Sequence, residues 1–265
     1  MAATCSSSRP GLRPVATQAA SKYLLQGERS PRGASSKPHV WLLRTRRERT
    51  AHLAGSDHLW LRCSMRTFIA LDLDPELKQR VERLQSPLRA GCERANWVVR
   101  WVQPEAMHLT LRFLGETGQA LLPALAKLLA GLTSRPAPGV TFAGLDSFGP
   151  PRRPKVLFTR VTLGTDALTE LAREIEQRVT ELGWPPETRA FHPHLTLGRV
   201  RRAKGMLSDV IQGRPDLERA ELGSCELGVV TLYQSVLRRE GPRYEPLARA
   251  RLVSTRSNVR SDRGT

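Results

Sequence analysis

Apolar and polar positions along the chain first become regular near Met65. Residues 66–72 are mostly apolar or β-branched, which predicts a strand. Asp, Pro and Glu at positions 74–76 are typical of a helix start, where they serve as N-cap, first-turn proline and first-turn acid. Apolar residues at i, i+4 and i+7 from Leu77 give this helix one apolar face, and we expect Pro87 to end it.

The rest of the chain repeats a similar order of strands and helices. Helices and strands mix without strict βαβ alternation, so the pattern predicts an α+β fold with antiparallel sheets. The remaining expected strands lie near residues 96–102, 107–114, 140–145, 155–163, 190–200, 226–237 and 244–247, and the remaining expected helices near 118–132, 166–182 and 204–211.

Composition divides the 265 residues into three parts. The formal net charge is +17, and residues 1–64 hold 11 Lys and Arg against three acidic side chains, with no sustained periodicity. We therefore expect 1–64 to be a basic, disordered extension, 65–248 to be the folded domain, and the arginine-rich 249–265 to be a disordered basic tail. The extension resembles a transit peptide, could bind nucleic acid, or precedes a true translation start at Met65.

Several classes of protein are excluded by simple features. The longest apolar stretch, residues 120–132, is too short to cross a bilayer and contains Pro123 and Lys127. The four cysteines are scattered, without the short spacings of metal sites or redox motifs. We expect a cytoplasmic protein that has no membrane partner and is monomeric.

One tetrapeptide occurs twice, as His108-Leu-Thr-Leu111 and His194-Leu-Thr-Leu197. Because side chains alternate between the faces of a strand, each copy places an imidazole and a hydroxyl on one face and two leucines on the other. A single copy is most simply a half-exposed strand with its polar face in water. Two copies, one in each half of the chain, instead favour a shared function.

Two opposed imidazole–hydroxyl pairs can carry out acid–base chemistry at a phosphorus atom. Imidazole has an unperturbed pKa near 6.5, so one ring can take a proton while the other gives one up. A threonine hydroxyl can hold a phosphoryl oxygen beside the ring. No metal or other cofactor is expected.

The two tetrapeptide motifs resemble those of the 2H phosphoesterase superfamily, which is defined by two His-x-Thr/Ser-x motifs. Within it the chain is most similar to the bacterial and archaeal RNA 2′,3′-cyclic phosphodiesterases, also called 2′-5′ RNA ligase-like proteins. The resemblance spans nearly all of residues 65–248 and is carried by Met65-Arg-Thr-Phe-Ile-Ala-Leu-Asp72, His108-Leu-Thr-Leu-Arg-Phe-Leu-Gly-Glu116, Pro193-His-Leu-Thr-Leu197, Leu232-Tyr-Gln-Ser-Val-Leu237 and Gly241-Pro-Arg-Tyr244.

The resemblance implies a bilobal fold whose two pseudo-symmetric lobes flank a cleft. It also implies hydrolysis of RNA 2′,3′-cyclic phosphate ends to a 2′-phosphate, with 2′-5′ ligation as a weak reverse activity. His108 is then the proton donor to the 3′ oxygen and His194 the group that activates water. Thr110 and Thr196 orient the phosphate, and Arg199 matches the family arginine that contacts it.

Three further expectations concern neighbouring residues. Strict alternation places Arg199 on the leucine face, so its role requires a β-bulge, for which Gly198 offers a cause. The same alternation places Arg112 on the histidine face, as a contact to the RNA backbone or a solvated strand end. Phe148 is a candidate for stacking a terminal base, although a hydrophobic plug is the commoner role.

Other functions remain open at this point. His192 and His194 could suggest zinc, but no third ligand is evident. The motifs hold only a phosphate, so the substrate could also be ADP-ribose 1″,2″-cyclic phosphate, a 2′-5′ oligoadenylate or another small cyclic phosphodiester. A non-catalytic RNA-binding module is the alternative from a different class.

Overall fold

The computed structural model describes residues 64–238 and 241–255. The chain divides into two units, Met1–Leu53 and Ala54–Thr265, and all described residues belong to the second. The expectations for residues 1–63, including the disordered extension, therefore lie outside the described residues. In the part that is described, no helix is long and apolar enough to cross a membrane.

The first sheet carries the first repeat of the tetrapeptide. It has four strands in the order β3-β1-β8-β9, and every pairing in it is antiparallel. Strand β3 is an edge strand and pairs only with β1. The strands are β1 (Ser64–Asp72), β3 (His108–Gly118), β8 (Val229–Leu237) and β9 (Pro242–Arg251).

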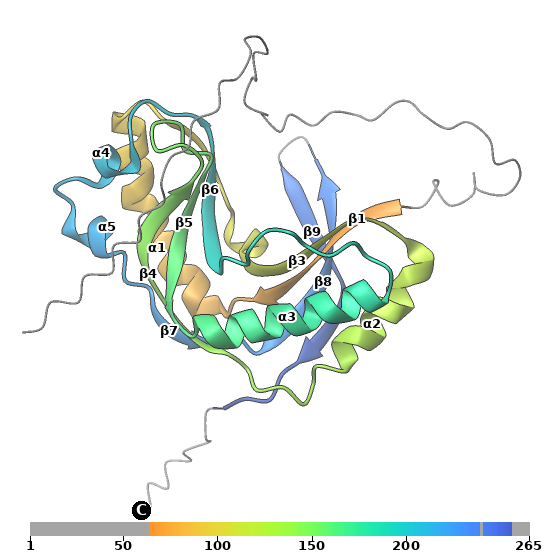
Figure 1. Cartoon of the computed structure of the whole chain (residues 1–265). Helices are drawn as coiled ribbons and strands as arrows, with labels where there is room; N and C mark the ends of the chain where they lie inside the picture. The colour runs from red at the N-terminus through yellow and green to blue at the C-terminus, as the bar shows by residue number, and fades with distance from the viewer. Residues whose placement is uncertain (1–63, 239–240, 256–265) are drawn as a thin grey trace, which may run out of the picture. The chain divides into compact units, whose positions relative to one another are not determined.

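The second sheet carries the second repeat. Its five strands have the order β2-β6-β5-β4-β7 and are also antiparallel. Strand β6 contacts β3 of the first sheet, and Figure 1 shows the two sheets side by side. The strands are β2 (Val98–Trp101), β4 (Gly139–Phe148), β5 (Val156–Leu163), β6 (His194–Arg202) and β7 (Gly223–Glu226).

Three longer helices cover these sheets and close one continuous core. α1 packs beside β2, α2 against β8 and β9, and α3 against β3. The structure is thus the mixed α+β, bilobal fold that the sequence predicted. The helices are α1 (Pro75–Arg94), α2 (Leu122–Ala130), α3 (Thr165–Glu181), α4 (Leu207–Ile211) and α5 (Pro215–Arg219), with single 3₁₀ turns at η2 (Pro104–Ala106) and η3 (Gln119–Leu121).

Pro87 does not end α1, contrary to the sequence-based expectation. The helix continues to Arg94, and its extra turns bury Leu88 and Cys92 in the core. An interior proline costs about 3 kcal/mol, and burying a leucine side chain stabilises by roughly 1.5–3 kcal/mol. Tertiary packing of the later turns therefore offsets the local penalty.

Two boundaries also differ from expectation. The second motif strand begins at His194 rather than near residue 190, since Pro193 has no N–H to donate to a sheet. At the C-terminal end, β9 runs to Arg251 and Leu252 is buried. The assignment of 249–265 to a disordered tail is therefore wrong for residues 249–255, which belong to the fold or lie directly against it. Residues 256–265 lie outside the described part.

Both motif strands contain a β-bulge at the fourth residue of the tetrapeptide. Leu111 is the extra residue of β3, because Thr110 pairs with Ala70 and Arg112 with Ile69. Leu197 is the extra residue of β6, because Thr196 pairs with Phe158 and Gly198 with Leu157. An extra residue changes which face the following side chains occupy. The residues directly after each motif therefore lie on the opposite face from the one that strict alternation predicts.

The bulge in β3 turns Arg112 toward α3. Its side chain is only 10% exposed and forms an ion pair with Glu176. It also donates to the carbonyl oxygen of Pro185 at 2.6 Å, in the segment that leads to the second motif. Glu176 in turn accepts a hydrogen bond from the backbone N–H of Glu187 at 2.7 Å. Arg112 thus connects the strand of the first motif to the loop that precedes the second.

We predict that Arg112→Met destabilises the protein by about 3 kcal/mol, because removal of one partner leaves the partly buried Glu176 carboxylate without its cation. Chemical denaturation of the purified variant measures the change. Arg173→Gln, an exposed arginine on the same helix as Glu176, is the matched control. Equal stability of the two variants would contradict the prediction.

A second prediction concerns the close approach of β2 and β6 at Gly198. A Cβ added at this position would lie 2.6 Å from Val99 Cγ1 and 3.3 Å from Trp101 Cε3. Gly198→Ala must therefore displace the edge strand β2, and we expect a loss of about 1–3 kcal/mol in the free energy of unfolding. Gly228→Ala, at a site where nothing lies within 4 Å of an added Cβ, should change stability far less.

Candidate active site

The four motif residues occupy equivalent positions in the two sheets. His108 is the first residue of β3 and His194 the first residue of β6. In each motif both leucines are buried, whereas the histidine and threonine are partly exposed. The hydroxyls of Thr110 and Thr196 make no hydrogen bond to any described residue, so both are free to donate to a ligand.

Both imidazole rings are held by the same local contact. Nδ1 of His108 lies 2.8 Å from the carbonyl oxygen of Ala106, and Nδ1 of His194 lies 2.7 Å from that of His192. A carbonyl oxygen can only accept, so each Nδ1 carries the proton and donates it. In the neutral ring Nε2 is then an unprotonated acceptor, and neither Nε2 has a hydrogen-bond partner within the described part of the chain. Each histidine therefore presents Nε2 for proton transfer.

Burial and positive charge both disfavour the protonated form of His108. Burial lowers its pKa to about 4 and outweighs the opposing hydrogen bond to Ala106. The charges of Arg199, His194 and Lys78 lower it further. Arg199 and His194 belong to the second sheet, so residues of both sheets act on the same ring.

His194 experiences a similar environment. Burial lowers its pKa, and the charges of Arg199 and His192 add to this effect against the hydrogen bond to the His192 carbonyl. Both rings are thus held neutral near pH 7 in a site that has excess positive charge. Such a site favours a negatively charged ligand, whose charge would offset the repulsion that each imidazolium experiences.

Three aromatic rings surround His108. The centroid of Phe68 lies 4.8 Å from the imidazole and that of Tyr233 6.1 Å from it. Tyr244 meets the ring nearly edge-on, at 5.0 Å and 86°. These rings come from β1, β8 and β9, and they account for the burial that lowers the pKa of His108.

Two further rings pack against His194. Phe148 meets it at 4.7 Å and 87°, and Phe158 at 5.2 Å and 65°. Phe148 is also stacked on Phe158, with centroids 4.2 Å apart. Phe148 therefore packs against the ring of His194 and is half-buried by its neighbours. Its stacking on a terminal base remains a proposal.

Arg199 lies on the same side as His194 because of the bulge at Leu197. It is exposed, and its charge acts on both histidines and on Tyr244. No ion pair to a described acidic residue occupies its guanidinium. Arg112, which strict alternation placed on the histidine face, instead pairs with Glu176 on the opposite face. The structure thus brings Arg199 to the site and removes Arg112 from it.

A partly buried hydrogen-bond network around one carboxylate lies beside His108. Asp72 pairs with His108 across the β1–β3 ladder. Its carboxylate accepts hydrogen bonds from the hydroxyls of Tyr233, at 2.8 Å, and Thr231, at 3.0 Å. Burial and the adjacent Asp72 raise the pKa of Tyr233 to about 12, so the phenol stays protonated and donates. This network holds one of the rings that enclose His108.

Sequence reasoning missed several of these residues. Phe68, Asp72, Tyr233 and Tyr244 lie within segments that carried the family resemblance, yet nothing local indicated that they meet around His108. Arg100 was also missed. It pairs with Arg199 across β2 and β6, and its charge acts on Tyr244.

His192 does not form part of a cluster of metal ligands. Over residues 64–238 and 241–255, no group of three or more His, Cys, Asp or Glu side chains is placed to hold a metal ion. Its carbonyl oxygen fixes the ring of His194, and its side chain is exposed.

Comparisons with known proteins agree with this site. The family model described as LigT like Phosphoesterase matches residues 71–158 and 163–244, which include both motifs. A protein of Aeropyrum pernix named RNA 2′,3′-cyclic phosphodiesterase is 32% identical over 157 residues, covering 59% of this chain and 88% of that protein. A protein of the same name from Methanothermobacter thermautotrophicus is 31% identical over 191 residues, covering 71% and 99%.

Solved structures show the same architecture. TT0787 of Thermus thermophilus matches with a TM-score of 0.59 and 26% identity, covering 72% of this chain and 100% of that one. Escherichia coli LigT in complex with 3′-AMP matches with a TM-score of 0.55 and 26% identity, covering 71% and 98%. The family model, the relatives and the paired motifs agree: this chain belongs to the LigT-like phosphoesterase family of the 2H superfamily.

Proposed function

We propose that this protein hydrolyses 2′,3′-cyclic phosphate ends of RNA, leaving a 2′-phosphate and a free 3′-hydroxyl. The names of its relatives support the substrate. The observation that carries the proposal is the matched pair of imidazoles, each with Nδ1 bonded to a backbone carbonyl and Nε2 free. Opening a cyclic phosphodiester requires one group that takes a proton and another that supplies one.

In the proposed reaction a water molecule attacks the phosphorus atom while Nε2 of His194 takes its proton. The bond from phosphorus to O3′ breaks, and protonated Nε2 of His108 gives its proton to O3′. His194 ends the cycle protonated and His108 neutral, and proton exchange with solvent restores the starting state. No step requires a metal ion.

The remaining groups bind the substrate. The free hydroxyls of Thr110 and Thr196 donate to the phosphoryl oxygens, and the unpaired guanidinium of Arg199 offsets their negative charge. Phe148 offers an aromatic surface to the terminal base beside His194. If a 5′-hydroxyl replaces the water, the same two histidines form a 2′-5′ phosphodiester bond, which is the proposed ligation activity.

The direct test is to incubate the full chain with an RNA that ends in a 2′,3′-cyclic phosphate, in the presence of EDTA, and to identify the product. We expect a 2′-phosphate. His108→Ala and His194→Ala should each lower kcat by about 10²–10⁴-fold, the usual contribution of a general acid or base. The control is Arg173→Gln, an exposed arginine on α3 that should keep full activity.

Three results would contradict this proposal in different ways. Loss of turnover in EDTA would contradict the metal-free mechanism. Full activity in either alanine variant would contradict the roles of the histidines. RNA binding without any turnover by the unaltered protein would favour a non-catalytic binding module.

A further prediction follows from the lowered pKa values of the two histidines. Burial and nearby cations hold the pKa of His108 at about 4 in the free protein, whereas a bound phosphate anion favours the imidazolium and raises it. The profile of kcat/KM against pH reports the free enzyme, and that of kcat reports the complex. We expect both to be bell-shaped, with the kcat profile displaced to higher pH by about 1–3 units, the usual effect of a nearby opposite charge. Coincident profiles would mean that the phosphate does not interact with these rings.

A further inference from the structure

Unpaired positive charge gathers at one end of the five-stranded sheet. The side chains come from the loop that joins β4 to β5, from the end of β6 and from the segment directly after β6, and all of them are exposed. We call this set the basic rim. Its members are Arg152, Arg153, Lys155, Arg201, Arg202 and Lys204.

Backbone pairing makes the basic rim continuous with the active site. The β4–β5 loop begins directly after Phe148, whose ring contacts His194. The backbone N–H of Val200 donates to the carbonyl oxygen of Lys155 at 2.8 Å, which brings the loop to β6. Arg202 lies three residues beyond Arg199 on β6, or roughly 10 Å at about 3.3 Å per residue.

The cations of the basic rim have no acidic partners, unlike cations near the other end of the motif strands. No member forms an ion pair with a described residue. By contrast, Arg189 in the loop before His194 pairs with Glu187 at 2.8 Å, and Arg249 lies 3.8 Å from Asp72, which faces His108. Along β6, unpaired cations continue from Arg199 into the basic rim.

Two acidic side chains near the basic rim in sequence accept hydrogen bonds from the backbone. Asp146 of β4 accepts a hydrogen bond from the backbone N–H of Ser147 at 2.7 Å. Asp209, shortly after Lys204, accepts one from the backbone N–H of Met206 at 2.7 Å. Neither offsets the charge of the basic rim by an ion pair.

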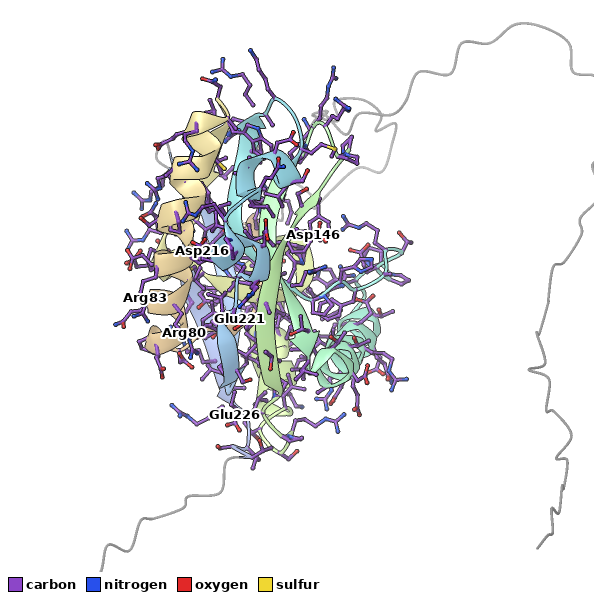
Figure 2. The ribbon with its side chains drawn as sticks, turned by 90° about the vertical axis from the view of Figure 1, so that its left-hand side faces the viewer. Arg80, Arg83, Asp146, Asp216, Glu221 and Glu226 are labelled. Carbon is purple, nitrogen blue, oxygen red and sulfur yellow. The ribbon has the colours of Figure 1, made fainter. Side chains whose placement is uncertain are left out.

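At one other place on the fold, arginines lie among acidic side chains. A cavity of about 280 Å³ beside α1 is lined by Arg80 and Arg83 and also by Asp216 and Glu221. Figure 2 shows these four residues together, with Asp146 lying apart from them. Mixed charge of this kind does not select an anion, whereas the basic rim has a single sign.

We propose that the basic rim binds backbone phosphates of the RNA upstream of its cyclic phosphate end. The inference rests on the proposed function and deepens it, because it makes the substrate an RNA strand rather than a cyclic mononucleotide. A strand whose last phosphate lies between the two histidines must leave the site through its upstream nucleotides. Contacts between phosphates and lysine or arginine position such a strand without reading its sequence.

The test compares two substrates with two triple variants of the full chain. The substrates are an eight-nucleotide RNA with a 2′,3′-cyclic phosphate end and a 2′,3′-cyclic mononucleotide. The rim variant is Arg152→Gln/Arg153→Gln/Lys155→Gln. The control variant, Lys127→Gln/Arg173→Gln/Arg219→Gln, removes equal charge from exposed, unpaired positions on α2, α3 and α5. Measured quantities are kcat/KM from 50 to 200 mM salt and the free energy of unfolding of each variant.

We expect the rim variant to lose about tenfold or more in kcat/KM on the oligonucleotide at low salt and to keep its activity on the mononucleotide. The slope of log kcat/KM against log salt for the oligonucleotide should become shallower by up to about 2, at about 0.7 per lost phosphate contact with a single strand. The control variant should retain the original slope.

Equal kcat/KM of the rim and control variants on the oligonucleotide would overturn the inference, while turnover of the mononucleotide would leave the proposed function standing. If the unaltered protein turns over neither substrate, the proposed function fails. Binding of the oligonucleotide by the two variants, measured over the same salt range, then tests phosphate binding by the basic rim separately. Equal salt slopes for the two variants would overturn the inference, and a shallower slope for the rim variant would support it.

Discussion

Burial of the two leucines in each tetrapeptide is the constraint on which the site depends. Leu109 and Leu195 are completely buried, and each is followed two residues later by a second buried leucine. Because neighbouring side chains in a strand point to opposite faces, anchoring the leucines in the core holds the alternating histidine and threonine on the other face. The carbonyl oxygen two residues before each histidine then fixes the tautomer. Position and tautomer of both rings therefore follow from backbone geometry.

Two effects lower the pKa values of both histidines. Aromatic rings around His108 and His194 remove water from the imidazoles, and Arg199 adds positive charge to both. Each effect favours the neutral ring in the absence of a ligand. The negative charge of a phosphodiester offsets the positive charge of Arg199 and raises the pKa of a nearby imidazole. Substrate binding itself can therefore prepare one ring to act as a proton donor. The unpaired arginine and the free hydroxyls are consistent with such a ligand.

The two bulges determine on which face of the strand the arginine after each motif lies. In β3 the extra residue turns Arg112 away from the histidines and into a partly buried ion pair with Glu176, where it supports the loop before the second motif. In β6 the extra residue turns Arg199 toward the histidines. One kind of backbone irregularity, at equivalent positions, thus gives a structural arginine in one lobe and a ligand-facing arginine in the other. It also starts the line of unpaired cations that continues into the basic rim.

Local features of the sequence determined much of this protein. The period of two along each tetrapeptide placed His108, Thr110, His194 and Thr196 correctly, and the apolar stripe expected over 166–182 corresponds to α3 (Thr165–Glu181). Such patterns depend on neighbours along the chain and can be recognised there. Only the tertiary structure decided that α1 continues through Pro87, that Arg112 and Arg199 exchange faces, and that Phe68, Tyr233 and Tyr244 enclose His108. The physical reason is that helix packing, strand register and ring contacts are set by partners far away in sequence, and one extra residue in a strand reverses the faces of the residues that directly follow it.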